Sequence, residues 1–243
     1  MYKSIVTEIV KRQKPKLLLI NASAFSYCNS NLTDEVYLRK WIDNMPMSQN
    51  KLDTVKTIPK NINNDDEKVK DNISDTLYFP LEKYHGNWKA PEAVYTSFVT
   101  RAYMRLSGGG YLKGFYSKTG ITGGRDNLAN IGQPTKEAYV LTDECRAYLK
   151  ELLSYCNKLG IKHVLLLQPP HETQAADKSG LEQIESITRE YGYDFLDLST
   201  DYESIAGIDD SHDFADFEHL NAYGAQKLSS YIGNLVVNPV SYT

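Results

Sequence analysis

Short continuous apolar runs alternate with helical patterns in this chain. The runs lie in KPKLLLINAS, IKHVLLLQPP and YDFLDLS, and turn-forming or small polar residues bound each of them. Such runs are typical of buried parallel strands. Between them, apolar residues recur at helical spacing, and Gly160 and Gly192 follow as natural C-terminal stops. The pattern predicts parallel strands at Leu17–Ile20, Val164–Leu167 and Phe195–Leu198, joined by helices.

This order of elements predicts an α/β fold with a doubly wound parallel sheet, in which function lies beyond the carboxyl ends of the strands. A final helix is expected in AYGAQKLSSYIGNLV. Residues 29–132 fit the alternation poorly and contain the polar run NINNDDEKVKDNISD. We therefore predict an α/β domain made of residues 1–28 and 133–243, with residues 29–132 as an inserted region that covers the cleft.

Composition narrows the classes of partner. The net charge is -4 and the basic residues are dispersed, so a nucleic-acid partner is not expected. No apolar run reaches the roughly 18 residues of a membrane span, and the first residues lack the apolar stretch of a secretory signal. A link to a membrane is expected only through a segment that is not in this sequence. Cys145 and Cys156 are predicted to be helix packing residues.

The stretch DFEHLN places Asp216 and His219 three residues apart, just before the predicted last helix. In acyl transfer, a serine needs a base to take its proton, and the base needs a carboxylate to orient it. Asp216 and His219 can supply that carboxylate and that base. The spacing alone also fits an Asp216 that caps a turn and a His219 that fills a surface groove, so both interpretations stay open.

DFEHLN followed by GAQKLSSYI resembles the last block of the SGNH/GDSL hydrolase superfamily, in which Asp-x-x-His precedes the terminal helix. With RKWIDNMPMSQNK, YFPLEKYHGNW and KGF, the chain resembles SGNH-like surface proteins of Gram-positive gut bacteria. Those proteins are similar to the acyl-transfer proteins that decorate teichoic acids or alginate. The resemblance implies a three-layer, flavodoxin-like SGNH sheet and an extracellular or cell-surface location.

The same resemblance implies an esterase or O-acyltransferase that acts on acyl esters of a cell-surface polysaccharide. A polysaccharide or an acyl donor is then the expected partner, and no metal or organic cofactor is expected. The alternative is a non-catalytic glycan-binding or accessory module that keeps the cleft but has an incomplete catalytic site.

The resemblance also implies a serine in a Gly-x-Ser turn after the first strand, and the sequence has no such turn there. Asn21 and Ala22 precede Ser23, the serine just beyond a predicted strand. Three interpretations stay open. The chain lacks its nucleophile block and first strand, or Ser23 is the nucleophile, or the site has another arrangement. The first predicts little or no esterase activity for this chain alone, with no serine hydroxyl within hydrogen-bond reach of His219.

Substrate-binding roles are expected for His85, Trp88, His171 and Asn221. In YHGNW, a tryptophan face suits a sugar ring and a histidine suits a hydrogen bond, although the group could equally anchor a packed loop. His171 follows QPP at a predicted strand end, on the side of the cleft. Asn221 ends the DFEHLN stretch.

Two further groups are polar. Arg39, Asn50 and Lys51 are interpreted either as a site for an anionic glycan or as members of surface ion pairs. The acidic loop DDSHDFAD around His212 is interpreted as a solvated turn. It lacks the glycine and the terminal glutamate of an EF-hand loop, so no metal site is predicted.

Overall fold

The computed structural model divides the chain into two compact units, Met1–Pro15 with Ser30–Phe115, and Lys16–Asn29 with Tyr116–Thr243. It describes residues 2–26, 41–43, 45–57, 77–78, 99, 120, 140–170, 178–216 and 219–237. In these ranges, none of the helices has the length and apolar character needed to cross a bilayer.

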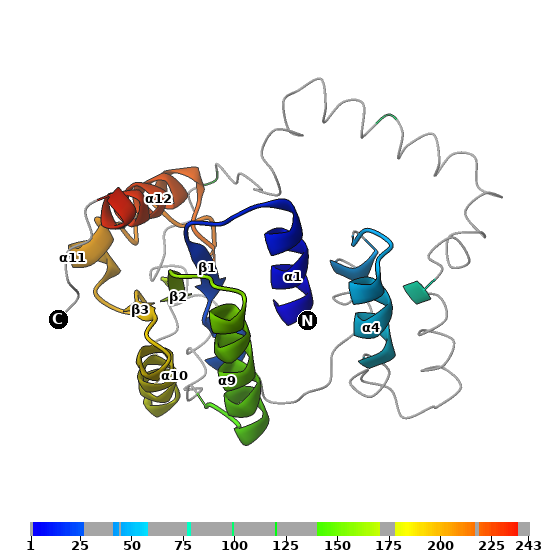
Figure 1. The fold of residues 1–243 in the computed structure, drawn as a ribbon. Helices are drawn as coiled ribbons and strands as arrows, with labels where there is room; N and C mark the ends of the chain where they lie inside the picture. Colours follow the sequence, from blue (N-terminus) through cyan, green and yellow to red (C-terminus); the bar gives the residue numbers. More distant parts are fainter. Residues whose placement is uncertain are drawn as a thin grey trace, which may run out of the picture. The chain divides into compact units, whose positions relative to one another are not determined.

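A small parallel sheet forms the centre of the second unit (Figure 1). Its strands, in the spatial order β1-β2-β3, are β1 (Leu18–Asn21), β2 (Val164–Gln168) and β3 (Asp194–Asp197). Both neighbouring pairs are parallel, and Leu166 lies in register with Ile20 on one side and Phe195 on the other. The predicted strands and their parallel pairing are therefore confirmed, and with them the α/β class.

Helices accompany this sheet in the described part of the second unit. They are α2 (Ser23–Ser26), α9 (Asp143–Lys158), α10 (Ser179–Glu190), α11 (Tyr202–Ala206) and α12 (Ala222–Val237). Helices α2, α9 and α10 contact one another, and α11 contacts α12. Figure 1 shows α9 beside α10, and α11 beside α12. The connections through α9 and α10 are long enough to return each strand parallel to the one before it.

The ends of α9 and α10 follow from local chemistry. The Thr142 side chain caps α9 by accepting a hydrogen bond from the backbone N–H of Cys145 at 3.2 Å. Gly160 and Gly192 have φ of 72° and 76°, the left-handed conformation that ends a helix. Both residues therefore act as the predicted stops. The helices end just before β2 and β3 begin.

In the described part of the second unit, apolar side chains pack on α9 and between the sheet, α11 and α12. The buried face of α9 consists of Cys145, Leu149, Leu152, Leu153 and Cys156. The predicted packing role of its two cysteines is confirmed, and burial raises the pKa of the Cys156 thiol to about 11. A second cluster joins the sheet to α11 and α12 and contains Leu167, Leu198, Tyr202, Ile208 and Phe214.

The first unit contains α1 (Tyr2–Arg12) and α4 (Gln49–Thr57), which contact each other. Hydrogen bonds join the two helices, since Asn50 Nδ2 donates to the carbonyl of Ser4 at 2.9 Å and Thr54 Oγ1 donates to Ser4 Oγ at 2.6 Å. Both helices belong to the unit made of residues 1–15 and 30–115. The expected division, with residues 1–28 and 133–243 as an α/β domain and residues 29–132 as an inserted region, stays a prediction.

Candidate functional site

The predicted catalytic loop is a tight hairpin that leads into α12. Phe214 and Leu220 form an antiparallel bridge. The backbone N–H of Ala215 donates to the carbonyl of His219 at 2.8 Å. Residue 216 and residue 219 therefore face each other across a short turn, as their sequence separation suggested.

Asp216 and His219 form the predicted hydrogen bond. The Nδ1 atom of His219 lies 2.7 Å from Oδ1 of Asp216. The side chains are 60% exposed for His219 and 33% exposed for Asp216. Contact through Nδ1 leaves Nε2 on the far side of the ring, where a general base must receive a proton. The arrangement can orient an imidazole and stabilise its protonated form.

Apolar residues tie this hairpin to the sheet. Phe214 is fully buried in the cluster that includes Leu167 of β2 and Leu198, which follows β3, and Leu220 packs against the same cluster. Leu167 lies near the carboxyl end of β2, and Leu198 comes directly after the carboxyl end of β3. Ligands of open parallel sheets bind beyond these ends, so the hairpin is anchored to the part of the sheet where a site is expected.

Asn221 caps α12. Its Oδ1 accepts hydrogen bonds from the backbone N–H groups of Tyr223 at 2.9 Å and Gly224 at 3.1 Å. Its Nδ2 donates to the carbonyl of His212 at 2.6 Å. The side chain is buried, and both ends of its amide hold backbone groups in place. The structure thus gives Asn221 a capping role, while its role in substrate binding stays a prediction.

Ser23 begins α2, directly beyond the carboxyl end of β1. Its backbone N–H donates to Oδ1 of Asn21 at 2.9 Å, so the asparagine side chain stabilises this turn. Its hydroxyl oxygen accepts a hydrogen bond from Nε2 of Gln168 at 3.3 Å. Among the described residues, the ring of His219 is hydrogen-bonded to Asp216 and not to Ser23.

Gln168 is a residue of this region that the sequence analysis did not identify. It is the last residue of β2 and is 0% exposed. Its Oε1 has no hydrogen-bond partner among the residues that the structure describes. The signal in the sequence was a single amide side chain at the end of an otherwise apolar, fully buried strand.

His85, Trp88 and His171 lie outside the described residues.

A second Asp–His pair lies at the base of the same hairpin. The Nδ1 atom of His212 lies 3.0 Å from Oδ1 of Asp213, whose side chain is 0% exposed. The Asp213 Oδ2 atom accepts from Lys227 Nζ at 2.6 Å and from the backbone N–H of Asp209 at 2.7 Å. The interpretation of this loop as a solvated turn is wrong for Asp213, because α12 brings Lys227 over it.

These contacts change the acidity of Asp213. Burial raises the pKa of Asp213, but the hydrogen bonds from Asp209, Lys227 and His212 outweigh burial and hold this pKa below its ordinary value.

Within the described ranges, no group of three or more His, Cys, Asp and Glu side chains is arranged to hold a metal ion. The Asp213 carboxylate is a buried, hydrogen-bonded anchor for the hairpin.

Asn50 and Lys51, considered for an anionic glycan or for surface ion pairs, are used inside the first unit. Asn50 Nδ2 donates to Oε1 of Glu8 at 2.8 Å, and this bond is the main reason why the pKa of Glu8 is lowered. Lys51 is buried, its Nζ donates to the carbonyl of Met45 at 3.3 Å, and burial lowers its pKa. Lys51 therefore does not offer an exposed charge to a glycan.

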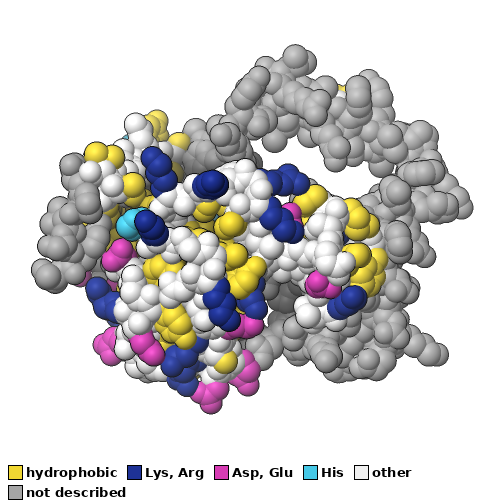
Figure 2. Space-filling model, viewed as in Figure 1, with side chains coloured by type: hydrophobic (Ala, Val, Ile, Leu, Met, Phe, Trp, Pro, Cys, Tyr) yellow, Lys and Arg dark blue, Asp and Glu magenta, His cyan; other side chains and the backbone are white. Residues whose placement is uncertain are grey.

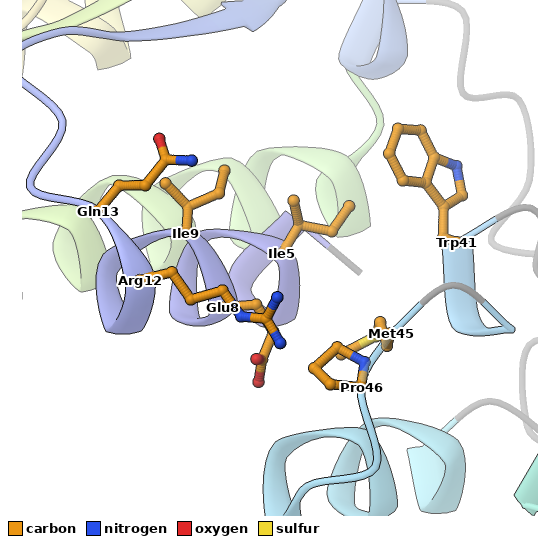
Figure 3. Close-up of a pocket in the computed structure, with 8 residues that line it drawn as sticks. All are labelled: Ile5, Glu8, Ile9, Arg12, Gln13, Trp41, Met45 and Pro46. Atoms are coloured by element: carbon orange, nitrogen blue, oxygen red, sulfur yellow. The ribbon is translucent and has the colours of Figure 1, made fainter. Parts of the chain in front are cut away.

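The first unit also has a groove of about 430 Å³. It is lined by Ile5, Glu8, Ile9, Arg12, Gln13, Trp41, Met45 and Pro46 (Figure 3). Figure 3 shows α1 supplying one wall, with Trp41, Met45 and Pro46 opposite. Trp41 is largely exposed. The walls are mainly apolar, with a few polar groups.

Figure 2 shows the distribution of charge on one face of the described residues. Basic and acidic side chains are interspersed there, and apolar side chains lie between them.

Comparison of the chain with protein-family models, curated proteins and solved structures found no match. The function is therefore proposed from the chemistry of the residues.

Proposed function

We propose that this chain is an SGNH-type esterase or O-acyltransferase domain that acts on acyl esters of a cell-surface polysaccharide. The observation that carries the proposal is the 2.7 Å contact between His219 Nδ1 and Asp216 Oδ1 on an exposed hairpin. This contact fixes the tautomer that leaves Nε2 available as a base. The resemblance of DFEHLN to the last SGNH block supports the choice of substrate class.

In this mechanism Ser23 is the nucleophile. Its oxygen bonds to the carbonyl carbon of the ester, and its proton passes to Nε2 of His219. The alcohol of the polysaccharide then leaves with that proton, and the acyl group remains on the serine. Water completes an esterase cycle, whereas a second sugar hydroxyl completes an acyl transfer. Asp216 stabilises the imidazolium of His219 throughout.

The test compares His219→Ala with His212→Ala, since both histidines contact an aspartate through Nδ1. We expect His219→Ala to slow hydrolysis of p-nitrophenyl acetate, and acetate release from an O-acetylated polysaccharide, by roughly 10²–10⁴-fold. His212→Ala should leave both rates within about threefold of the unmodified protein, because the proposal gives His212 no part in the chemistry and Asp213 keeps its bonds to Lys227 and the N–H of Asp209. Equal rates for the unmodified protein and His219→Ala would contradict the proposal.

A second candidate function is a non-catalytic glycan-binding module. The observation that favours it is that, in the described part of the chain, the His219 ring is bonded to Asp216 and to no serine. Equilibrium binding to the O-acetylated polysaccharide separates the two candidates. Tight binding without acetate release, unchanged in Ser23→Ala, identifies a binding module. Acetate release that is lost in Ser23→Ala identifies an enzyme.

A further inference from the structure

The buried side-chain amide of Gln168 is expected to lower the stability of the folded protein. Gln168 ends β2, and alternation along the strand places it on the same face as Val164 and Leu166, both of which are apolar and fully buried. Its Oε1 atom has no hydrogen-bond partner among the described residues. A buried amide oxygen without a partner destabilises a protein, and an apolar side chain of the same size does not. The fold alone therefore gives no reason for a glutamine here.

The backbone of Gln168 does not supply that reason. Its carbonyl accepts a hydrogen bond from the N–H of Leu198 at 2.9 Å, which any residue at this position could do. Its register partner is Asp197, whose Oδ1 accepts from the N–H of Ser199 and whose Oδ2 lies 3.9 Å from Lys178 Nζ. Asp197 thus interacts with Ser199 and Lys178. The distinctive contact of Gln168 is with Ser23.

The Gln168 amide can fix the direction of the Ser23 hydroxyl. The 3.3 Å bond from Nε2 occupies a lone pair on Oγ, so the hydroxyl proton must point in another direction. If the amide were turned over, Oε1 would receive the serine proton and Nε2 would lack a partner instead. One amide atom stays unmatched in either orientation, so the cost of keeping this amide does not depend on the assignment.

We infer that Gln168 is a positioning residue for the Ser23 hydroxyl. The side-chain Nε2–H of Gln168 holds the serine oxygen at the carboxyl edge of the sheet. It also turns the hydroxyl proton of Ser23 away from the strand, toward a position from which a base can remove it. The amide also stabilises negative charge as it develops on that oxygen. This inference rests on the proposed function, because it gives Ser23 the role of nucleophile.

The experiment measures how fast a fluorophosphonate labels Ser23 in the full chain, with peptide mapping of the product. In this reaction the serine oxygen bonds to phosphorus, the phosphorus–fluorine bond breaks, fluoride leaves, and the hydroxyl proton passes to the base. The variant is Gln168→Met, which keeps the length of the side chain and removes the amide. Leu166→Met is the matched control, since it lies on the same strand and face.

We expect Gln168→Met to label Ser23 about 10- to 100-fold more slowly, as for a misplaced reacting group. Its midpoint of thermal unfolding should equal or exceed that of the unmodified protein, because an unmatched amide atom is gone. A residue that only supports the fold would give the opposite result for stability. Leu166→Met should label at the unmodified rate.

Three outcomes would overturn the inference. Equal labelling of Gln168→Met and the unmodified protein removes the role of Gln168 and leaves the proposed function intact. A midpoint several degrees lower in Gln168→Met shows that the amide supports the fold. Absence of labelling at Ser23 in the unmodified protein removes Ser23 as nucleophile and overturns both proposals together.

Discussion

Two Asp–His pairs occupy one short stretch of this chain and have opposite surroundings. At the base of the hairpin, Asp213 is fully buried and binds His212, Lys227 and a backbone N–H. At the tip, Asp216 is one-third exposed and its histidine is 60% exposed. Both pairs join Nδ1 of the ring to Oδ1 of the carboxylate, so the contact itself does not distinguish them.

The surroundings decide what each pair can do. A buried carboxylate must keep its cation and its hydrogen bonds, because removing a partner leaves an uncompensated charge in a region without water. An exposed pair contributes little to stability, since water replaces either partner. The pair at the base is therefore committed to the fold, whereas the pair at the tip is available for chemistry. A separation of three residues or fewer in sequence does not reveal this difference.

Among the predictions, removal of the Asp213 carboxylate should cause the largest change in the free energy of unfolding. We expect Asp213→Ala to lower the free energy of unfolding by about 3–5 kcal/mol, because Lys227 and the N–H of Asp209 lose a buried partner. The matched variant Asp216→Ala should lower it by less than about 1 kcal/mol. Denaturant titration followed by circular dichroism measures both. Equal losses in the two variants would abolish the distinction between base and tip.

The close approach of α12 to the base gives a second test. A Cβ atom at Gly224 would lie 2.3 Å from the carbonyl oxygen of Asp213 and 2.9 Å from a methyl carbon of Leu220. Gly224→Ala should therefore cost about 1–3 kcal/mol of unfolding free energy.

Gly233 is the control for Gly224, because it lies in the same helix and a Cβ there meets nothing within 4 Å. Gly233→Ala should stabilise the protein by up to about 1 kcal/mol, the helix propensity of alanine over glycine. Thermal melts of the two variants should move in opposite directions. A Gly224→Ala protein as stable as Gly233→Ala would mean that the helix does not need its close contact with Asp213.

The smallest expected effect concerns acid stability. The folded state lowers the pKa of Asp213 below its ordinary value of 3.8, so folding favours the ionised carboxylate. The resulting stabilisation is complete above the unfolded pKa and is lost as pH falls through the lower, folded pKa. Below pH 3.8 the unmodified protein should therefore lose more stability per pH unit than Asp213→Asn. Parallel slopes in thermal melts between pH 2 and 6 would contradict this assignment.

The sequence predicted the parts of the fold that depend on local patterns. The three strands begin and end within one residue of their expected positions, and Gly160 and Gly192 end their helices. The contact between Asp216 and His219 was also predictable, since a short turn brings residues three apart together. These features need only the periodicity and turn chemistry of neighbouring residues.

Features that depend on distant segments were missed. Asp213 was interpreted as part of a solvated turn, while in the structure it is buried and accepts a hydrogen bond from Lys227, which lies 14 residues further on. Gln168 had no visible partner, because Ser23 is 145 residues away in sequence. The contacts of Asn50 with Ser4 and Glu8 in the first unit were missed for the same reason. Tertiary packing set the environment of each of these residues.

The alkylation rate of the Cys156 thiol can report how often α9 separates from the residues packed against it. With its pKa raised to about 11, roughly one molecule in ten thousand carries the reactive thiolate at pH 7, and the side chain is also out of reach of reagents. Alkylation must then wait for α9 to separate from its neighbours. The rate of modification by iodoacetamide reports how often that happens, so the chain contains its own probe of local unfolding.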